Sequence, residues 1–196
     1  MQKVTKEVGE LLKAGDYTLY DGRNYKGSTD LDSLEYLEYL LGEKEARAFS
    51  ALQKTMTSQK NQGKSVFDIW MMEESFLVQE CGMAYVERMV LDQFIKRIDT
   101  AEESLQKTLR KVCLLFALHI IQRDMGWYVC HKVLKPRKGL EVDKVIQQLC
   151  GNGTDGLGDD VLSLVDAFGI PEYVMAAPIA SDWVEYNERD NQGEVV

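Results

Sequence analysis

Only a few residues have the types and spacing that chemistry requires, and none of them completes an active site. His119 is a single imidazole in an apolar stretch, and acid–base catalysis needs a partner that the sequence does not place. We interpret it as a core histidine satisfied by a hydrogen bond. The carboxylate pairs Glu73-Glu74 and Glu102-Glu103 are adjacent in sequence, so their side chains point to different sides of a helix. We predict solvated helix faces for both pairs.

The segment GNGTDG at positions 151–156 matches G-x-G-x-x-G, the glycine pattern of dinucleotide-binding turns. That chemistry needs a preceding strand within a βαβ unit, whereas a helical pattern precedes this segment. We therefore interpret it as a turn between helices. The oxygen-bearing residues Asn152, Asp155, Asp159 and Asp160 do not follow the ligand order of a calcium-binding EF-hand loop. The two last aspartates instead favour the start of a helix through its dipole.

One basic cluster, formed by Lys132, Lys135, Arg137 and Lys138, could attract the phosphate of a cofactor such as coenzyme A. A solubilising loop explains the same residues, because basic side chains at the end of a helix complement its dipole. We favour the loop interpretation. A small acyl-CoA or lipid binder that uses this cluster is the weaker alternative.

The composition is typical of a globular protein that works inside the cell or in an organelle reached without a cleaved signal. The chain has 196 residues, 45% of them hydrophobic, which is enough for a substantial core. Its net charge of -9 disfavours binding to nucleic acids and to anionic membrane surfaces. No apolar run approaches the roughly 20 residues that span a bilayer, and the N-terminus leads into no signal-peptide core.

The four cysteines are widely spaced and form no C-x-x-C pair, which argues against a zinc site. Three of them lie in apolar helical patterns, where a free thiol behaves as a small hydrophobe. We predict buried, inert thiols in a reducing compartment and no metal ligand at these positions: Cys81, Cys113, Cys130 and Cys150.

The elements that position these residues are predicted to be helices, because apolar residues recur three and four apart and alternating runs are absent. We expect an all-α helical bundle with two long central helices. The first covers 65–98, with an inner stripe of Ile69, Met72, Phe76, Met83, Val86, Val90 and Phe94. The second begins at a capping box of Thr100 and Glu103 and carries the core segment 112–121, and it ends in 132–139, where Pro136 lies. Further helices are expected at 1–13, 43–62, 140–150 and 159–168. Another is expected at 31–41, which begins after a cap at Thr29 or Asp30 and ends at Gly42.

The segment Leu164 to Ile179 closes one helix and opens another turn. Its apolar stripe ends at Gly169, which accepts the left-handed conformation of a helix stop. Pro171 suits a first helical position, and Pro178 ends the segment. We place one helical domain at residues 1–181 and a polar, acidic tail with little to bury at 182–196.

Two segments resemble the C-terminal helical domain of the acyl-CoA oxidases: LQKTLRKVCLLFALHIIQRDMGWYV, at 105–129, and LVDAFGIPEYVMAAPIA, at 164–180. The residues on the family's core-helix pattern LCxLxxLxxIxxxxG are Cys113, Leu114, Phe116, Leu118, Ile121 and Gly126. Those on its pattern LVDAFxxPDxxxxxPI are Val165, Asp166, Ala167, Phe168, Pro171, Pro178 and Ile179. The N-terminus, residues 1–8, is similar to the helix that follows the family's Tyr/Phe-Glu-Gly-Asp-Asn motif, which carries the catalytic glutamate.

The resemblance implies the C-terminal third of a longer flavoenzyme, without the catalytic glutamate and without the FAD-binding dehydrogenase part. No catalytic residue is therefore assigned to any position, and the residues that bind a cofactor stay unassigned. The implied reaction of the whole enzyme is desaturation of a fatty acyl-CoA to the trans-2-enoyl-CoA, with hydrogen peroxide formed from dioxygen. The chain alone is expected to bind no FAD and to be inactive.

The implied partners are the remainder of the oxidase and a second copy in a homodimer, with no nucleic acid and no membrane. The resemblance also implies the peroxisome, although Glu194-Val195-Val196 is not an S-K-L type signal. The alternative is a non-catalytic helical interaction or dimerisation module derived from the same fold.

Overall fold

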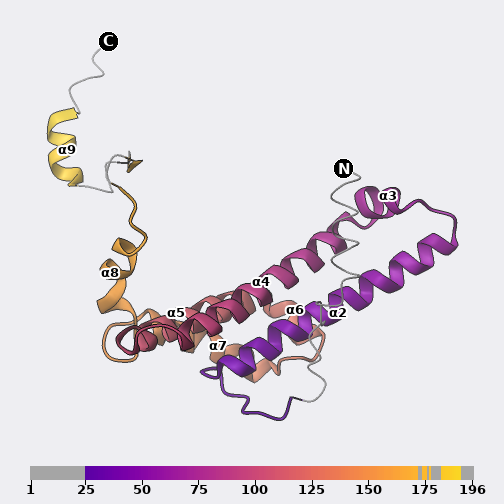
Figure 1. Cartoon of the computed structure of the whole chain (residues 1–196), viewed down its shortest axis with the longest axis horizontal. Helices are drawn as coiled ribbons and strands as arrows, with labels where there is room; N and C mark the ends of the chain where they lie inside the picture. The colour runs from indigo at the N-terminus through magenta and orange to yellow at the C-terminus, as the bar shows by residue number, and fades with distance from the viewer. Residues whose placement is uncertain (1–24, 172–173, 176, 178–181, 191–196) are drawn as a thin grey trace. The chain divides into compact units, whose positions relative to one another are not determined.

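The structure is a computed structural model that describes residues 25–171, 174, 175, 177 and 182–190 (Figure 1). The chain divides into two compact units, the first ending at Leu157 and the second beginning at Gly158. The described residues form helices and turns and no strand, which confirms the predicted all-α fold. The helix predicted at residues 1–13 lies outside the described residues, and the boundary predicted after residue 181 stays a prediction.

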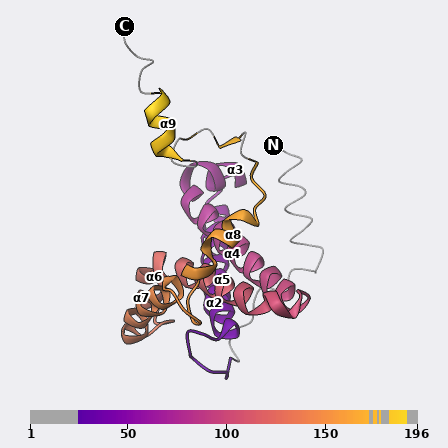
Figure 2. The ribbon, with the colours of Figure 1, turned by 90° about the vertical axis from the view of Figure 1, so that its left-hand side faces the viewer.

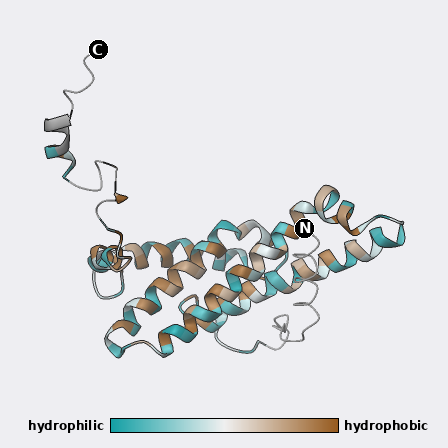
Figure 3. Cartoon of the chain, turned by 45° about the horizontal axis from the view of Figure 1, so that its top comes forward, coloured by the Kyte–Doolittle hydropathy of each residue, from teal (hydrophilic) through white to brown (hydrophobic). Residues whose placement is uncertain are grey.

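The first unit is built on long helices that lie side by side (Figures 1 and 2). Helix α2, Leu34–Asn61, packs against α4, Ser75–Asp99, and both contact α5, Glu103–Arg123. The short α6, Met125–Cys130, and α7, Pro136–Cys150, complete the unit against α5. Hydrophobic residues recur along all the long helices (Figure 3).

Helix α2 is continuous, whereas the sequence predicts two helices separated at Gly42. The prediction was wrong because Gly42 is buried inside the helix, and packing of its neighbours holds the backbone. Leu40 and Leu41 before it are fully or nearly fully buried in the core. The cap is also different: the Ser33 hydroxyl accepts the Tyr36 N–H at 3.3 Å, a role that the sequence assigns to Thr29 or Asp30.

The predicted helix 65–98 is interrupted by a π-helix. Ser65 caps the single turn α3, Val66–Asp68, and η2, Ile69–Glu73, follows with a 2.8 Å bond from the Glu74 N–H to the Ile69 carbonyl. A bond across five residues adds one residue to the turn, so every later residue is rotated relative to a regular α-helix.

That rotation decides which side of α4 is buried. Ile69, before the extra residue, is fully buried as predicted, but Phe76 is 79% exposed. Of the remaining predicted inner residues, only Phe94 packs partly against the core. Those that are exposed instead are Met72, Met83, Val86 and Val90. The buried positions of α4 are Cys81, Ala84, Glu87, Leu91 and Ile98.

Helix α5 begins at Glu103, with Glu102 as its N-cap residue, two residues later than a capping box starting at Thr100 would place it. The Thr100 hydroxyl donates to the carbonyls of Lys96 and Arg97 at the end of α4, and so is not available to the start of α5. The core segment is confirmed, with most of its residues buried in the main cluster. These residues are Cys113, Leu114, Ala117, Leu118, Ile120 and Ile121.

The second predicted long helix ends earlier than expected. Asp124 separates α5 from α6, and Lys132 adopts a positive φ of 57° in the link that follows. Pro136 does not end a helix but occupies the first position of α7, where its missing N–H is not needed.

The second unit contains the 3-10 turn η3, Gly158–Asp160, and the helices α8, Val161–Asp166, and α9, Trp183–Asp190. Gly169 has φ +60°, so the predicted helix stop is confirmed, and the Val174 N–H donates to the Pro171 carbonyl at 3.0 Å. The predicted role of Pro178 falls outside the described residues. Part of the predicted polar tail is helical, because the Asp182 carboxylate accepts the first N–H groups of α9.

Candidate functional site

The candidate residues from the sequence are not brought together into one site. His119 lies on the exposed side of α5, so its interpretation as a core histidine was wrong. The Glu73 carboxylate pairs with Lys64, and the Glu74 carboxylate accepts from the Gln59 amide at 2.5 Å. These two carboxylates therefore serve different partners, in agreement with the prediction that they form no acid–base pair.

The GNGTDG segment at 151–156 is a turn between helices, as predicted. It follows α7, and the Leu157 N–H beyond it donates to the Leu149 carbonyl at 2.7 Å. A Cβ at Gly156 would lie 1.8 Å from the Gly151 carbonyl oxygen, which accounts for the glycine at that position. The Lys111 ammonium donates to the Gly156 carbonyl at 2.6 Å and ties the turn to α5. These contacts make the turn an architectural element.

The basic cluster is spread around the start of α7 rather than placed after a helix. Lys135 is the N-cap residue of α7, and Arg137 and Lys138 occupy its first turn. The interpretation as a helix C-terminal loop was therefore wrong for these residues. The Lys138 ammonium is partly neutralised by Glu141, 2.8 Å away, while Lys132 lies exposed in the preceding link.

The cysteines divide into two classes. Cys81 and Cys113 are buried, and burial raises the pKa of their thiols to about 11 and about 12, as predicted for inert thiols. Cys130 and Cys150 are exposed, so the prediction of burial was wrong for these two. Among the described residues, no three His, Cys, Asp or Glu side chains lie close enough to hold a metal ion.

A buried ionic network links α2, α4 and the junction between α5 and α6. Glu45, whose side chain is 0% exposed, pairs with Arg88, which is 11% exposed. Beside this pair, the Lys44 ammonium lies 2.6 Å from the Asp124 carboxylate. Two further contacts close the network, from Arg123 to Asp124 at 2.7 Å and from Arg123 to Glu87 at 2.6 Å. The sequence analysis missed all six residues.

The pKa shifts in the network follow from burial and pairing. Burial raises the pKa of Glu45 above its ordinary value, although the Arg88 guanidinium opposes this shift. Burial would also raise the pKa of Asp124, but hydrogen bonds from Arg123 and Lys44 outweigh it and lower that pKa. The hydrogen bonds that Arg123 donates to Asp124 and to Glu87 raise the pKa of its guanidinium.

The ionic network is poorly suited to binding a substrate or to acid–base catalysis. Most of its charged atoms are already paired within the chain, so they are not free to bind an anionic substrate. The buried side-chain atoms here without a hydrogen-bond partner among the described residues are Oε2 of Glu87 and the hydroxyl of Tyr128. Burial, followed by the charges of Asp124 and Glu87, raises the pKa of Tyr128, so the phenol stays protonated. We conclude that the network holds helices together.

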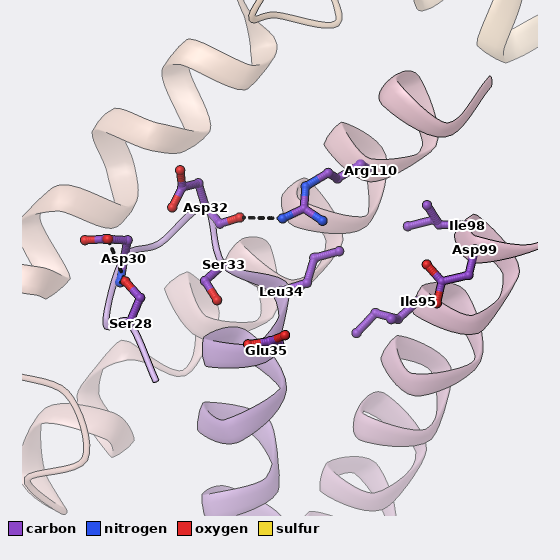
Figure 4. Close-up of a pocket in the computed structure, with 10 residues that line it drawn as sticks. All are labelled: Ser28, Asp30, Asp32, Ser33, Leu34, Glu35, Ile95, Ile98, Asp99 and Arg110. Atoms are coloured by element: carbon purple, nitrogen blue, oxygen red, sulfur yellow. Dashed lines mark hydrogen bonds between the residues drawn. The ribbon is translucent and has the colours of Figure 1, made fainter. Parts of the chain in front are cut away.

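A separate pocket of about 510 Å³ lies where the loop before α2 meets the end of α4 and the start of α5 (Figure 4). Its floor includes Leu34 and Ile98, and its single cation is Arg110, which donates to the Asp32 carbonyl at 3.2 Å. The acidic residues of its lining are Asp30, Asp32, Glu35 and Asp99. Four carboxylates around one arginine repel phosphates, so these residues do not fit the pyrophosphate of FAD or of coenzyme A.

Exposed apolar side chains are a further feature of the first unit. They lie in α3, in η2 and along α4. The sequence analysis placed part of them, from Met72 to Val90, on an inner side. The most exposed of them are Phe67, Met71, Met72, Phe76 and Met83. The charged Asp68 and Glu73 are exposed among them, so the apolar side chains of α3 and η2 are interrupted before those of α4.

The fold is an all-helical domain with apolar side chains exposed on α4. A family model described as acyl-CoA oxidase matches residues 36–182, so the chain belongs to the acyl-CoA oxidase family. This confirms the resemblance drawn from residues 105–129 and 164–180.

Several relatives share about half of this chain. An acyl-coenzyme A oxidase-like protein of Mus musculus is 30% identical over 104 residues, which are 52% of this chain and 16% of that protein. Acyl-coenzyme A oxidase 1 of Yarrowia lipolytica is 29% identical over 102 residues, 52% of this chain and 14% of that protein. A protein named peroxisomal acyl-coenzyme A oxidase 2, from Arabidopsis thaliana, is 28% identical over 54% of this chain and 15% of its own length.

Two solved structures share the fold over nearly the whole chain. The crystal structure of acyl-CoA oxidase 3 from Yarrowia lipolytica matches 94% of this chain and 29% of its own, with a TM-score of 0.72 and 19% identity. That of oxidase 1 from the same organism matches 93% of this chain and 27% of its own, with a TM-score of 0.70 and 22% identity. The chain thus spans less than a third of the oxidases that it resembles. None of the described helices is long and apolar enough to cross a membrane.

Proposed function

We propose that this chain is the C-terminal helical part of a flavin-dependent acyl-CoA oxidase and that it supports the enzyme structurally. The observation that carries the proposal is a family match over residues 36–182 on an all-helical fold that exposes apolar side chains along α4. The charged residues that join α2, α4 and α5 are paired with one another rather than arranged as an open acid–base site. Such a chain is suited to packing against other helices.

The whole enzyme, in this proposal, desaturates a fatty acyl-CoA to the trans-2-enoyl-CoA and reduces dioxygen to hydrogen peroxide in fatty acid β-oxidation. The acidic lining of the pocket does not fit the pyrophosphate of FAD, and we assign the flavin to the dehydrogenase portion. We further propose a homodimer in the peroxisome, supported by the relative that is named as peroxisomal. The alternative is a helical interaction module that has kept the fold without an oxidase partner.

A chimera tests the proposal. This chain replaces the matching region of acyl-coenzyme A oxidase 1 of Yarrowia lipolytica, and hydrogen peroxide formation from a fatty acyl-CoA is measured. We expect the chimera to retain flavin and activity, whereas the same oxidase truncated before that region loses both. A chimera that folds and holds flavin no better than the truncated enzyme would favour the interaction module.

A further inference from the structure

The link between α6 and α7, together with the first turn of α7, carries an unbalanced positive charge. No acidic residue occurs between Asp124 and Glu141, and the basic cluster lies in this interval. Its Lys138 pairs with Glu141 at 2.8 Å. Among the described residues, the other cations of the cluster have no carboxylate within ion-pair distance, and all of them are exposed. These unpaired cations are Lys132, Lys135 and Arg137.

The start of α7 lacks the groups that normally neutralise the positive end of a helix. Lys135 is its N-cap residue and makes no side-chain cap hydrogen bond, and the first turn holds no acidic residue. Helix starts favour Asp, Asn, Ser or Thr at the cap and carboxylates in the first turn, because the dipole places positive charge there. The cations of the cluster therefore add to the charge of the dipole instead of opposing it. Both attract an anion that the chain itself does not supply at this position.

The backbone of the link is held in place by contacts from the core and from α2. The Tyr128 carbonyl accepts the N–H groups of Val133 at 3.0 Å and of Leu134 at 3.2 Å. The Leu134 side chain is buried in the main core cluster. From α2, the Arg47 guanidinium donates to the His131 carbonyl at 2.8 Å. A ligand bound at this link loses little affinity to the ordering of the backbone, because the backbone is already fixed.

The charge of the whole chain limits the size of the anion that the cluster can bind. A net charge of -9 repels an extended polyanion such as a nucleic acid or an anionic membrane surface. At physiological salt, however, charges more than about 8 Å from a ligand are largely screened. A compact anion that touches only the cluster therefore meets an attractive field. Phosphate fits these side chains well, because arginine binds its oxygens in pairs and lysine binds it as a point charge.

We propose that the basic cluster at the start of α7 binds the phosphate groups of a small molecule, with Lys135 and Arg137 as the main contacts. Inorganic diphosphate and a nucleoside diphosphate present the same chemistry to these side chains. The exposed His131 ring, stacked on Trp127 with the ring centroids 4.3 Å apart, lies next to the cluster and provides a surface on which a base can stack. The inference goes beyond the structural role proposed above and requires neither flavin nor the remainder of the oxidase.

Titration calorimetry of the full chain with inorganic diphosphate tests the site. Lys135→Ser/Arg137→Gln removes two unpaired cations of the cluster. The matched control is Lys54→Ser/Lys60→Gln, which removes two exposed cations of α2 and changes the net charge by the same amount. Far-UV circular dichroism checks that each variant keeps its helices.

We expect diphosphate to bind the parent chain and the control alike, and to bind Lys135→Ser/Arg137→Gln at least tenfold more weakly. The affinity of the parent chain should also fall between about 0.01 M and about 0.1 M salt, where the Debye length drops from about 30 Å to about 10 Å. Absence of binding to the parent chain would overturn the inference. Equal weakening in the two variants would overturn it as well, because that result reflects net charge rather than a site.

Two further titrations distinguish the sources of the phosphate. Tighter binding of ADP than of diphosphate, lost in His131→Ala, would assign the site to a nucleotide, whereas equal affinity for both would assign it to the diphosphate group alone. Vesicles of phosphatidylserine provide the comparison with a membrane surface. Binding to these vesicles without binding to diphosphate would contradict a small-molecule site.

Discussion

The pair between Glu45 and Arg88 provides the sharpest test of how the first unit is held together. Arg88→Met keeps a long apolar stem in place of the guanidinium but leaves Glu45, at 0% exposure, without its cation. Removing one partner of a buried pair costs about 3–5 kcal/mol. For a chain of this size, each kcal/mol lowers the melting temperature by about 2–4 °C, so we expect a fall of about 6–20 °C.

A second substitution separates the buried charge from lost packing. In Arg88→Met/Glu45→Leu both charges are gone, and a well-packed apolar replacement of a buried pair is often neutral or stabilising. We therefore expect the double variant to recover most of the stability lost by the single variant. The measurement is urea unfolding followed by circular dichroism, with the free energies combined in a double-mutant cycle.

The pH dependence adds an independent check. Burial raises the pKa of Glu45 in the folded state, and Arg88→Met removes the group that opposes this shift. An acid whose folded pKa lies above its unfolded pKa binds protons more readily when folded, so its contribution to stability improves as the pH falls through the folded pKa. The deficit of Arg88→Met should shrink as the pH falls from neutral toward the ordinary pKa of a glutamate. Asp124, whose pKa is lowered, titrates below that window.

The reasoning would be refuted by a cost below about 1 kcal/mol for Arg88→Met, which is the range of an exposed pair. It would be refuted equally by a double variant no more stable than the single one. A deficit that grows as the pH falls would mean that Glu45 is not the group left unpaired.

Further predictions concern single side chains. Tyr128→Phe should not lower the free energy of unfolding, because it removes a buried hydroxyl that has no partner among the described residues; a loss above about 1 kcal/mol in urea unfolding would show that the hydroxyl is hydrogen-bonded. Cys130 and Cys150 should react with a thiol reagent in the native protein, whereas Cys81 and Cys113 should react only after unfolding, as followed by mass spectrometry. Four equally reactive thiols in the native protein would contradict the observed burial.

The fold class could be predicted from the sequence because helical periodicity is a local signal that repeats along the whole chain. The helix stop at Gly169 and the turn at 151–156 could be predicted for the same reason, since glycine acts through its own backbone. Continuity through Gly42 could not, because tertiary packing outweighs the local preference against glycine.

The sequence could have indicated that charged residues are buried in the ionic network, but not which of them form pairs. Glu87 and Arg88 lie between apolar residues, and Lys44 and Glu45 come shortly after Leu40 and Leu41. Charged residues at such positions are buried only when they are paired. Nothing in the sequence shows which cation pairs with which carboxylate, because the partners are far apart along the chain. Arg88 and Glu45 are 43 residues apart, and Lys44 and Asp124 are 80 residues apart.

The orientation of α4 shows why a single added residue changes the functional interpretation of the chain. The spacing from Ile69 to Phe76 predicts one apolar side, and that side was assigned to the core. The i to i+5 bond at Glu74 shifts the register, so the core takes Cys81 and Leu91 while Phe76 turns outward. The apolar stripe is thus real but belongs to a surface. Helix α4 therefore buries one set of apolar residues and leaves a second set exposed. The exposed set supports the proposal that this chain is one part of a larger enzyme.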